Sequence, residues 1–375
     1  MNRARERWFD VAIVGGGLVG AALAFGMREL GARVALLDEG DVALRASRGN
    51  FGLIWVQGKG LGMPAYAAWT QRSAREWPRF AAELAAATGI DVALRTAGGL
   101  AVCLSRDELM LRAARMESLF AQGGERYPLD VLDRDAVLAR LPDAGPSVAG
   151  GTWCPLDGDC NPLRLLHALH VAAQRAGVAY LPAHPVASIN AESVGFALDT
   201  VQGTVRCERV VLAAGLGNAR LAPMVGLAMP VTPNQGHIVA LERVQPFLPF
   251  PLENVRQTDD GTVLVGDAQR ECGADDRLDT GILSAIAARA VRIFPHLRDV
   301  RVTRAWSALR VMSPDTFPIY AQSRTHRGAF GVTCHSGVTL AAVHALVLGP
   351  ALARGELPAA CAPFGMERFD VRAAA

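Results

Sequence analysis

The sequence predicts an α/β domain of the Rossmann type that is interrupted by a second, sheet-rich α+β domain. The 375 residues are 51% apolar and 20% charged, which suits about two folded domains rather than a disordered chain. Helices and strands alternate near both ends of the chain, whereas residues 230–265 are rich in proline and β-branched residues. The second domain is therefore expected to be inserted into the first.

The N-terminal segment predicts a βαβ unit. An apolar strand is expected over residues 9–14, followed by a glycine turn and a helix over 18–30. Gly31 provides a stop signal for this helix, and a second apolar strand is expected over 33–38.

Later elements are expected where apolar periodicity runs between start and stop signals. The predicted helices span residues 64–88, 107–122, 162–177, 279–294 and 338–354. Strands are expected over 92–105, which carries a glycine turn, over 209–214, and within 230–265. The Rossmann-like domain is expected to comprise residues 1–85, 146–228 and 306–375, and the inserted domain 86–145 and 229–305.

Composition narrows the kinds of partner and site. The formal net charge of +2 gives no basic field for nucleic acid, so small molecules and proteins are the expected partners. Seven dispersed cysteines without a CxxC motif argue against a disulfide framework and indicate no metal site. Asp10 and several glycines interrupt the first apolar stretch, so no transmembrane segment is expected. The expected location is cytoplasmic, with peripheral contact to the inner membrane left open.

The first glycines form a GxGxxG motif, and an acidic residue ends the second predicted strand. Such glycines allow a tight turn, close approach of a pyrophosphate and close helix–strand packing. The N-terminus of the following helix offers free N–H groups to the phosphates, and the acidic residue suits the ribose hydroxyls. The motif predicts a dinucleotide-binding site but does not distinguish NAD from FAD as the cofactor. The residues expected to bind the cofactor are Gly15, Gly17, Leu18, Val19, Gly20, Asp38 and Glu39.

Four further segments resemble the FAD-dependent amino-acid oxidoreductases of the D-amino-acid oxidase family. They are RASRGNFG, GGTWCPLDGDCNPLRLLHAL, RVVLAAGLGN, and ALRVMSPDTFPIY followed by GVTCHSGVTLAAVHALVLGPALA. The resemblance implies a Rossmann-like FAD-binding domain with an inserted substrate domain, as in the glutathione reductase and D-amino-acid oxidase folds. It also implies that FAD is lined by Arg45, Ser47, Arg48, Gly49, Asn50 and Gly215. Ala308 lies near the position of the flavin-bearing cysteine of monomeric sarcosine oxidases, so FAD is expected to be non-covalent.

One segment is most similar to a subgroup of this family. SRGNFGLIWVQGKGLGMPAY resembles the FAD-bearing β subunits of heteromeric opine, D-hydroxyproline and cyanide-forming glycine dehydrogenases. This resemblance implies a small amino- or imino-acid substrate and partner subunits that carry electrons onward. Oxygen and a quinone remain alternative electron acceptors.

Two segments near the C-terminus suggest roles toward the flavin and the substrate. Ser336, Gly337, Val338 and Thr339 precede a predicted helix, where N–H groups would stabilise negative charge on a reduced flavin. The alternative is an ordinary capped helix. Arg310 stands where many family members hold the substrate carboxylate beside the flavin, and its planar fork suits that group. The alternative for Arg310, as for Arg304, is a structural salt bridge.

Three further residues are candidates for a catalytic role. Lys59 is the single lysine among 38 basic residues and lies in a Gln-Gly-Lys-Gly loop. A lysine near the ring promotes the reaction with oxygen in some flavin oxidases, although not from this position, and a solvated lysine is the alternative. His237 and His335 could shape the substrate pocket or could be packing residues.

The reaction expected from the resemblance is oxidation of a C–N bond by hydride transfer from Cα to flavin N5. Orientation of the substrate, with Arg310 as the carboxylate anchor, would contribute most to catalysis, and no His or Glu base is required. A flavin-dependent hydroxylase, an NAD(P)-dependent dehydrogenase and a flavin-holding subunit that is inactive without its partner are the alternatives.

Overall fold

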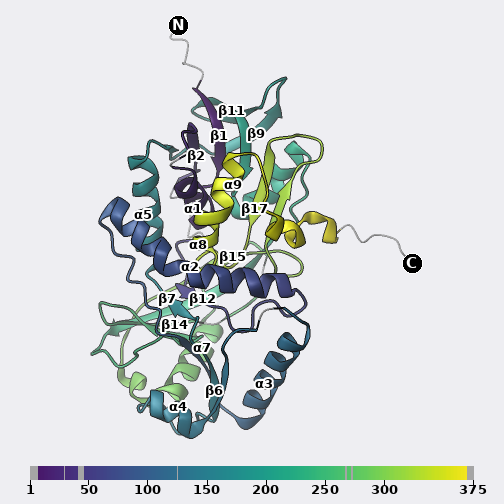
Figure 1. The fold of residues 1–375 in the computed structure, drawn as a ribbon. Coiled ribbons are helices and arrows are strands. Elements are labelled where there is room, and N and C mark those ends of the chain that lie inside the picture. Colours follow the sequence, from purple (N-terminus) through teal and green to yellow (C-terminus); the bar gives the residue numbers. More distant parts are fainter. Residues whose placement is uncertain are drawn as a thin grey trace.

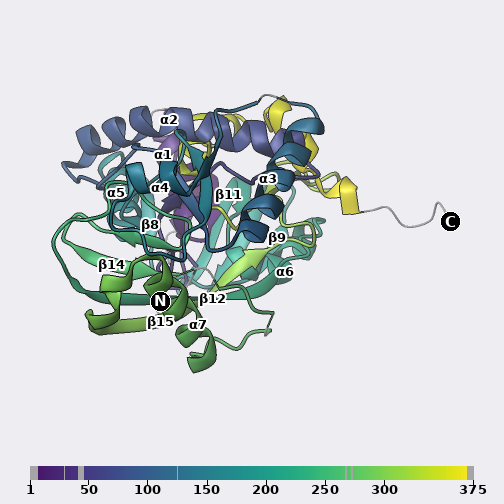
Figure 2. The same cartoon turned by 90° about the horizontal axis from the view of Figure 1, so that it is seen from below.

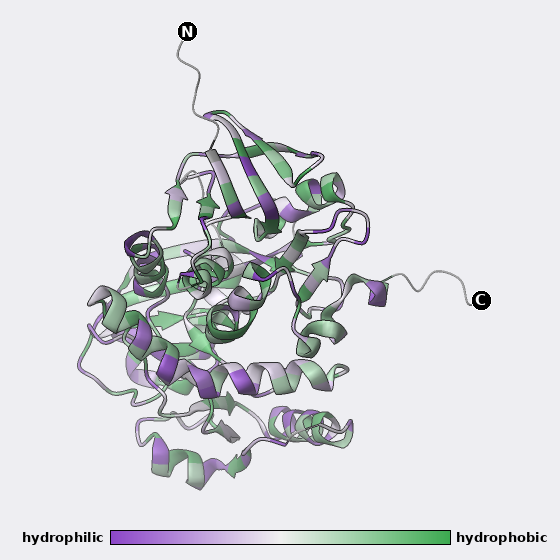
Figure 3. Ribbon diagram, turned by 45° about the horizontal axis from the view of Figure 1, so that its top comes forward, coloured by the Kyte–Doolittle hydropathy of each residue, from purple (hydrophilic) through white to green (hydrophobic). Residues whose placement is uncertain are grey.

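The computed structural model describes residues 7–28, 30–40, 46–124, 126–266, 268–271 and 273–369. Two large sheets dominate it, and the long helix α2 (Pro64–Thr88) runs between the two lobes that contain them (Figure 1). The strands at the centre of the molecule are the most apolar parts of the ribbon (Figure 3). Among the described residues, no helix combines the length and the apolarity that a membrane span requires.

The larger sheet has eight strands in the order β16-β17-β11-β1-β2-β8, and the β9–β10 hairpin extends from β11. Neighbours are parallel from β17 to β8, and helix α1 (Leu18–Met27) connects β1 to β2. Apolar residues cover both faces, because helices pack on one face and a smaller apolar layer packs on the other. The strands are β1 (Arg7–Val14), β2 (Val34–Leu37), β8 (Ala179–Leu181), β9 (Val186–Ala191), β10 (Phe196–Thr200), β11 (Gly203–Leu212), β16 (Ile319–Gln322) and β17 (Ala329–Thr333).

The second sheet is antiparallel and has the order β13-β14-β12-β15. One face buries Val239, Leu241 and their neighbours against helix α7 (Thr280–Ile293), which lies beside β12 and β15 (Figure 2). The opposite face carries Ile238 and Ala240 and packs against Phe51. Because side chains alternate along a strand, this pattern fixes which residues face the first lobe. The strands are β12 (Thr232–Arg243), β13 (Val255–Gln257), β14 (Thr262–Val265) and β15 (Val302–Met312).

Smaller elements complete the second lobe and link it to the first. Strands β4, β6 and β5 form a three-stranded sheet, and β3 pairs with β7. Helices α3 and α4 flank the three-stranded sheet, whereas α5 packs against α1 and α2 in the first lobe. The elements are β3 (Leu53–Ile54), β4 (Gly99–Cys103), α3 (Arg106–Ala121), β5 (Asp130–Asp133), α4 (Arg134–Arg140), β6 (Gly150–Cys154), β7 (Gly158–Asp159) and α5 (Pro162–Arg175).

The predicted helices form close to their expected bounds with one departure, and α4 has no predicted counterpart. Helix α2 begins at Pro64 and ends before Gly89, whose φ of 73° is the left-handed conformation that glycine adopts readily. The helix expected over 338–354 is instead divided into α8 (Ala341–Val343), a π-helical turn at His344–Leu348 and α9 (Gly349–Ala353).

The strand expected over 92–105 is shorter than predicted, because only Gly99–Cys103 pairs within a sheet. Two of the expected domain boundaries fall within sheets. Strand β6, which follows the boundary at 146, pairs with β4 and β5 of the inserted segment, and β15 spans the boundary at 306. The strand pairing thus crosses the chain at points that differ slightly from these two expected boundaries.

Trp77 ties α2 to the segment that precedes α8. Its indole N–H donates to the carbonyl oxygens of Val338 (3.2 Å) and Thr339 (3.1 Å), and the side chain is fully buried. We expect Trp77→Phe to destabilise the fold by about 1–3 kcal/mol, because it leaves both carbonyls without this donor. Denaturant unfolding measures the change. Arg79→Ala on the same helix, which removes an exposed ion pair with Glu83, is the control and should cost about 0.3–0.5 kcal/mol. Equal effects of the two substitutions would contradict the structural role of Trp77.

Candidate active site

The glycine turn lies where the carboxyl ends of β1 and β11 meet. Gly15 has a φ of 111°, and a Cβ atom there would collide with the carbonyl group of Ala213. A Cβ atom at Gly20 would collide with the carbonyl group of Gly15. The turn, the start of α1 and the end of β11 can therefore pack together only because these positions are glycines.

The N-terminus of α1 presents N–H groups that suit an anionic ligand. Leu18 N–H donates to the Ser47 hydroxyl at 2.9 Å, whereas those of Gly17 and Val19 donate to no acceptor within the described part of the chain. Free donors at a helix N-terminus bind phosphate well. These residues fit the pyrophosphate of a dinucleotide, as the motif predicts.

Asp38 directly follows β2 and orders the same turn. Its carboxylate accepts hydrogen bonds from the N–H groups of Gly16 (2.8 Å) and Gly40 (2.9 Å), and the side chain is buried. A ribose contact of Asp38 or of the adjacent Glu39 stays a prediction. Arg45, which was also expected near the cofactor, lies outside the described residues.

The segment from Ser47 to Asn50 connects the glycine turn to the second sheet. Gly49 packs so closely on Ala308 that a Cβ atom there would collide with that side chain, and the Asn50 amide oxygen accepts from Gly52 N–H at 2.7 Å. Arg48 in this segment is exposed. Gly215, with a φ of 58°, lies after β11 and approaches Val311 of β15. The residues expected around FAD therefore extend from β1 to the face of the second sheet.

Arg310 lies on the face of β15 that is directed toward the first lobe. It is opposite Asn234 of β12, and its guanidinium donates to the Asn234 amide oxygen (3.2 Å) and the Ala268 carbonyl oxygen (2.7 Å). The guanidinium lies over Gly236, where a Cβ atom would be 2.7 Å from it. Glycine at this position gives the planar group its space, and the two acceptors hold it in place.

The segment Ser336–Thr339 offers a second set of unused donors. The N–H groups of Gly337, Val338 and Thr339 donate to no acceptor within the described ranges, although Val338 and Thr339 are buried. Buried N–H groups normally have a partner. A ligand with acceptor atoms, such as the N1 and C2 carbonyl edge of a flavin, fits this segment.

Lys59 and His335 meet beside that segment. Lys59 Nζ is 2.8 Å from Ser336 Oγ and 3.2 Å from His335 Nε2, and the Tyr66 hydroxyl donates to Ser336 Oγ at 3.0 Å. Desolvation lowers the pKa of Lys59 to about 8, against an opposing effect of Glu253. Desolvation and the nearby charges of Lys59 and Arg310 lower the pKa of His335 well below its usual value. Lys59, His335 and Arg310 therefore share one electrostatic environment.

A buried polar network lies behind Lys59 that the sequence did not reveal. The Asp157 carboxylate accepts from Val56 N–H (2.5 Å) and from the Gln57 side-chain amide (2.7 Å). Arg112 joins Gln57 (2.9 Å) to the Glu253 carboxylate (2.8 Å). Burial raises the pKa of Asp157 to about 7. Asp157 belonged to a motif that resembled the family, but nothing in the spacing connected it to the other members of this network.

His237 lies apart from the other predicted catalytic residues. It projects from β12 toward α7, on the face of the sheet opposite to Arg310, and its Nε2 accepts from Asp279 N–H at 3.1 Å. The side chain is buried, and desolvation lowers its pKa. The charge of Arg310 also helps to lower the pKa of His237, but the two side chains lie on opposite faces of the sheet.

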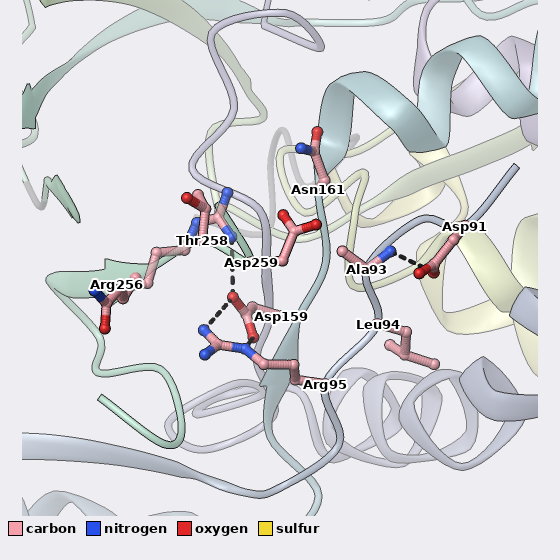
Figure 4. Close-up of a pocket in the computed structure, with 10 residues that line it drawn as sticks. Asp91, Ala93, Leu94, Arg95, Asp159, Asn161, Arg256, Thr258 and Asp259 are labelled. Atoms are coloured by element: carbon pink, nitrogen blue, oxygen red, sulfur yellow. Dashed lines mark hydrogen bonds and ion pairs between the residues drawn. The ribbon is translucent and has the colours of Figure 1, made fainter. Parts of the chain in front are cut away.

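A separate pocket of about 220 Å³ contains none of the predicted catalytic or cofactor-binding residues (Figure 4). Its charged groups are largely paired with one another: Asp159 binds Arg95 through two bonds of 2.8 Å and Arg256 through one of 2.9 Å. These bonds tie β7 to β13 across the two lobes. Among the described residues, no group of histidine, cysteine and acidic side chains could hold a metal ion.

The glycine turn gives a direct test of cofactor binding. We expect Gly15→Ala to lose most of its bound flavin, because the new methyl group collides with Ala213 and the φ of 111° disfavours any side chain. The ratio of visible to ultraviolet absorbance of the purified protein measures flavin content. Gly31→Ala is the matched control, since Gly31 also has a positive φ, of 70°, but has open space around it. Full flavin content in Gly15→Ala would contradict this role of the turn.

Comparisons with known proteins agree with this geometry. The sequence model of the family described as "FAD dependent oxidoreductase" (DAO) matches residues 10–349. An opine oxidase subunit from Rhizobium meliloti is 46% identical over 366 residues, which cover 97% of this chain and 99% of that protein. The crystal structure of glycine oxidase from Geobacillus kaustophilus has a TM-score of 0.88 and 28% identity, covering 96% of this chain and 98% of that one. This chain therefore belongs to the DAO family of FAD-dependent oxidoreductases.

Proposed function

We propose that this FAD-dependent oxidoreductase oxidises the C–N bond of a small amino or imino acid. The candidate substrate classes are D-amino acids, D-hydroxyproline, opines and glycine derivatives. The observation that carries the proposal is the position of Arg310. This cation is held on the sheet face directed toward the first lobe, in the same electrostatic environment as Lys59 and His335. A planar guanidinium there suits the carboxylate that all of these substrates share.

The residues around Arg310 can orient such a substrate. The bonds to Asn234 and Ala268 fix the guanidinium, so the carboxylate would be bound at a defined place with little loss of side-chain entropy. FAD, when bound, would accept the hydride that leaves the substrate Cα together with its two electrons. The unused N–H groups of Gly337, Val338 and Thr339 would stabilise negative charge at the cofactor edge that they face.

We also propose that the chain acts as the FAD-bearing subunit of a heteromeric dehydrogenase. The names of two similar proteins support this, because both are subunits: that of opine oxidase, and the hydrogen cyanide synthase subunit HcnC of Pseudomonas aeruginosa at 27% identity. The same names support the alternative that the chain holds flavin but is inactive without a partner.

Anaerobic titration of the purified protein with separate amino- and imino-acid classes tests the proposal. Bleaching of the flavin bands by one class would support C–N oxidation and identify the substrate class. If no class bleaches the flavin until a partner subunit is added, the chain is the inactive flavin-holding subunit. Reduction by NADPH but by no amine would favour a hydroxylase and contradict the proposal.

The role of Arg310 can be tested by a conservative substitution. We expect Arg310→Lys to weaken the binding of a substrate about 10- to 150-fold, because a charge-assisted bond contributes about 1.5–3 kcal/mol and lysine lacks the planar fork. Spectral titration of the flavin with a carboxylate analogue measures the dissociation constant. Arg304→Lys is the matched control, because Arg304 lies on the same strand but is exposed. Unchanged affinity in Arg310→Lys would show that Arg310 does not bind the carboxylate.

A further inference from the structure

Lys59 has a defined orientation, and the proposed function assigns it no task. Its amino group contacts two fixed groups, Ser336 Oγ at 2.8 Å and His335 Nε2 at 3.2 Å. Ser336 is itself held by the Tyr66 hydroxyl at 3.0 Å, and Tyr66 is buried in α2. The flanking residues Gly58 and Gly60, with φ values of 78° and 91°, shape the loop that presents the lysine. Lys59 is thus oriented by its surroundings, although a surface lysine normally moves freely.

The two contacts determine where the nitrogen lone pair of Lys59 points. The His335 ring also hydrogen-bonds the backbone of Thr316, and that bond raises its pKa, as a bond donated to a carbonyl does. The proton of the neutral ring is then on the Thr316 side, so Nε2 is an acceptor whose single lone pair faces both the Lys59 amine at 3.2 Å and the Ser336 hydroxyl at 3.1 Å. A neutral lysine amine has two N–H bonds and one lone pair. If it donates to Ser336 and His335, its lone pair is directed to the remaining tetrahedral position.

The charges around Lys59 come from both lobes. Charges of both signs oppose one another there: Arg310 disfavours the ammonium form, whereas the Glu253 and Asp157 carboxylates favour it, and desolvation outweighs them all. The titratable groups that face Lys59 or its immediate partners are Glu253, Asp157, Cys334, Arg310, His335 and Tyr66. Because of this balance, the Lys59 amine is neutral in a substantial fraction of the molecules at a pH at which an ordinary lysine is charged.

We infer that Lys59 is the base that removes a proton from the substrate ammonium group before hydride transfer. The inference rests on the proposed function, since it requires an amine substrate whose carboxylate is bound by Arg310. An amino acid in neutral water is an ammonium ion, which has no lone pair to support departure of the Cα hydride. A base near the carboxylate site removes this barrier.

The proposed step conserves protons and electrons. The N–H proton of the substrate passes to the lone pair of Lys59, which gives a neutral substrate amine and a Lys59 ammonium. The Cα hydride then leaves with its electron pair to FAD, so the substrate is oxidised to a protonated imine and the cofactor is reduced. Lys59 returns its proton to solvent. The ammonium form is accommodated meanwhile by Ser336, by His335 and by the nearby carboxylates.

A labelling experiment tests Lys59 without measuring turnover. Trace acetylation of the holoenzyme over a pH series, read by peptide mass spectrometry, reports the neutral fraction of this single lysine. We expect Lys59 to label with an apparent pKa of about 8 and to be protected by a carboxylate analogue of the substrate. Arg298→Lys adds a reference lysine at an exposed position, which should label with an ordinary pKa of about 10.4 and without protection. Identical profiles for the two lysines would overturn the inference.

Anaerobic flavin reduction then separates this inference from the proposed function. We expect Lys59→Met to slow reduction at least about 100-fold at neutral pH, while FAD content and analogue affinity are retained. The rate should recover as the pH approaches the pKa of the substrate amine itself. Arg298→Lys should reduce like the wild type.

Two results would count against the inference in different ways. Unchanged reduction in Lys59→Met would overturn the role of Lys59 and leave C–N oxidation intact. Failure of every amine to reduce the wild type, alone or with a partner subunit, would overturn the proposed function and this inference with it.

Discussion

The site depends on how the segment Ser336–Thr339 is held. Its oxygen atoms accept the hydrogen bonds that hold the segment in place. Trp77 and Ser73 of α2 donate to backbone carbonyls, and the Thr339 hydroxyl accepts from Trp55 N–H at 3.1 Å. The N–H groups of Gly337, Val338 and Thr339 take no part in these bonds, so they remain available to a ligand while the backbone is held in place. A preorganised set of donors needs no rearrangement when charge develops. The aromatic residues of α2 therefore serve the site although they lie in the core.

The arrangement also explains why the polar residues of the site come from distant parts of the chain. Arg310 lies on the second sheet, Ser336 follows the last parallel strand of the first sheet, and Lys59 lies in the loop that connects β3 to α2. Among the described residues, the arginine of the site comes from the second lobe, whereas the row of free N–H groups comes from the first. Joining the lobes creates the site, and the ion pairs of Asp159 with Arg95 and Arg256 link β7 to the segment before β4 and to β13.

The sequence predicted elements whose signals are local, and it could not predict contacts or strand register. The glycine turn, α1, α2 and the donors before α8 follow from periodicity, caps and a family resemblance. The pairing of Lys59 with Ser336, 277 positions away, leaves no local signal. His237 was expected in a strand and Arg310 was placed by the family resemblance alone, but only the pairing of Asn234 with Arg310 shows that His237 points to the other face. The roles of these side chains toward FAD and substrate remain predictions.

Burial of the single lysine also has a consequence for the stability of the fold. In the unfolded chain Lys59 holds its proton up to a pH of about 10.5, whereas in the folded chain it releases the proton at about 8. Between these values the unfolded state binds more protons at this side chain, so its contribution to stability rises with pH. Below this range the folded protein must hold an ammonium ion in a partly desolvated site. Near neutral pH, the side chain that we assign to proton transfer therefore destabilises the folded state, and this unfavourable contribution becomes smaller in mildly alkaline solution.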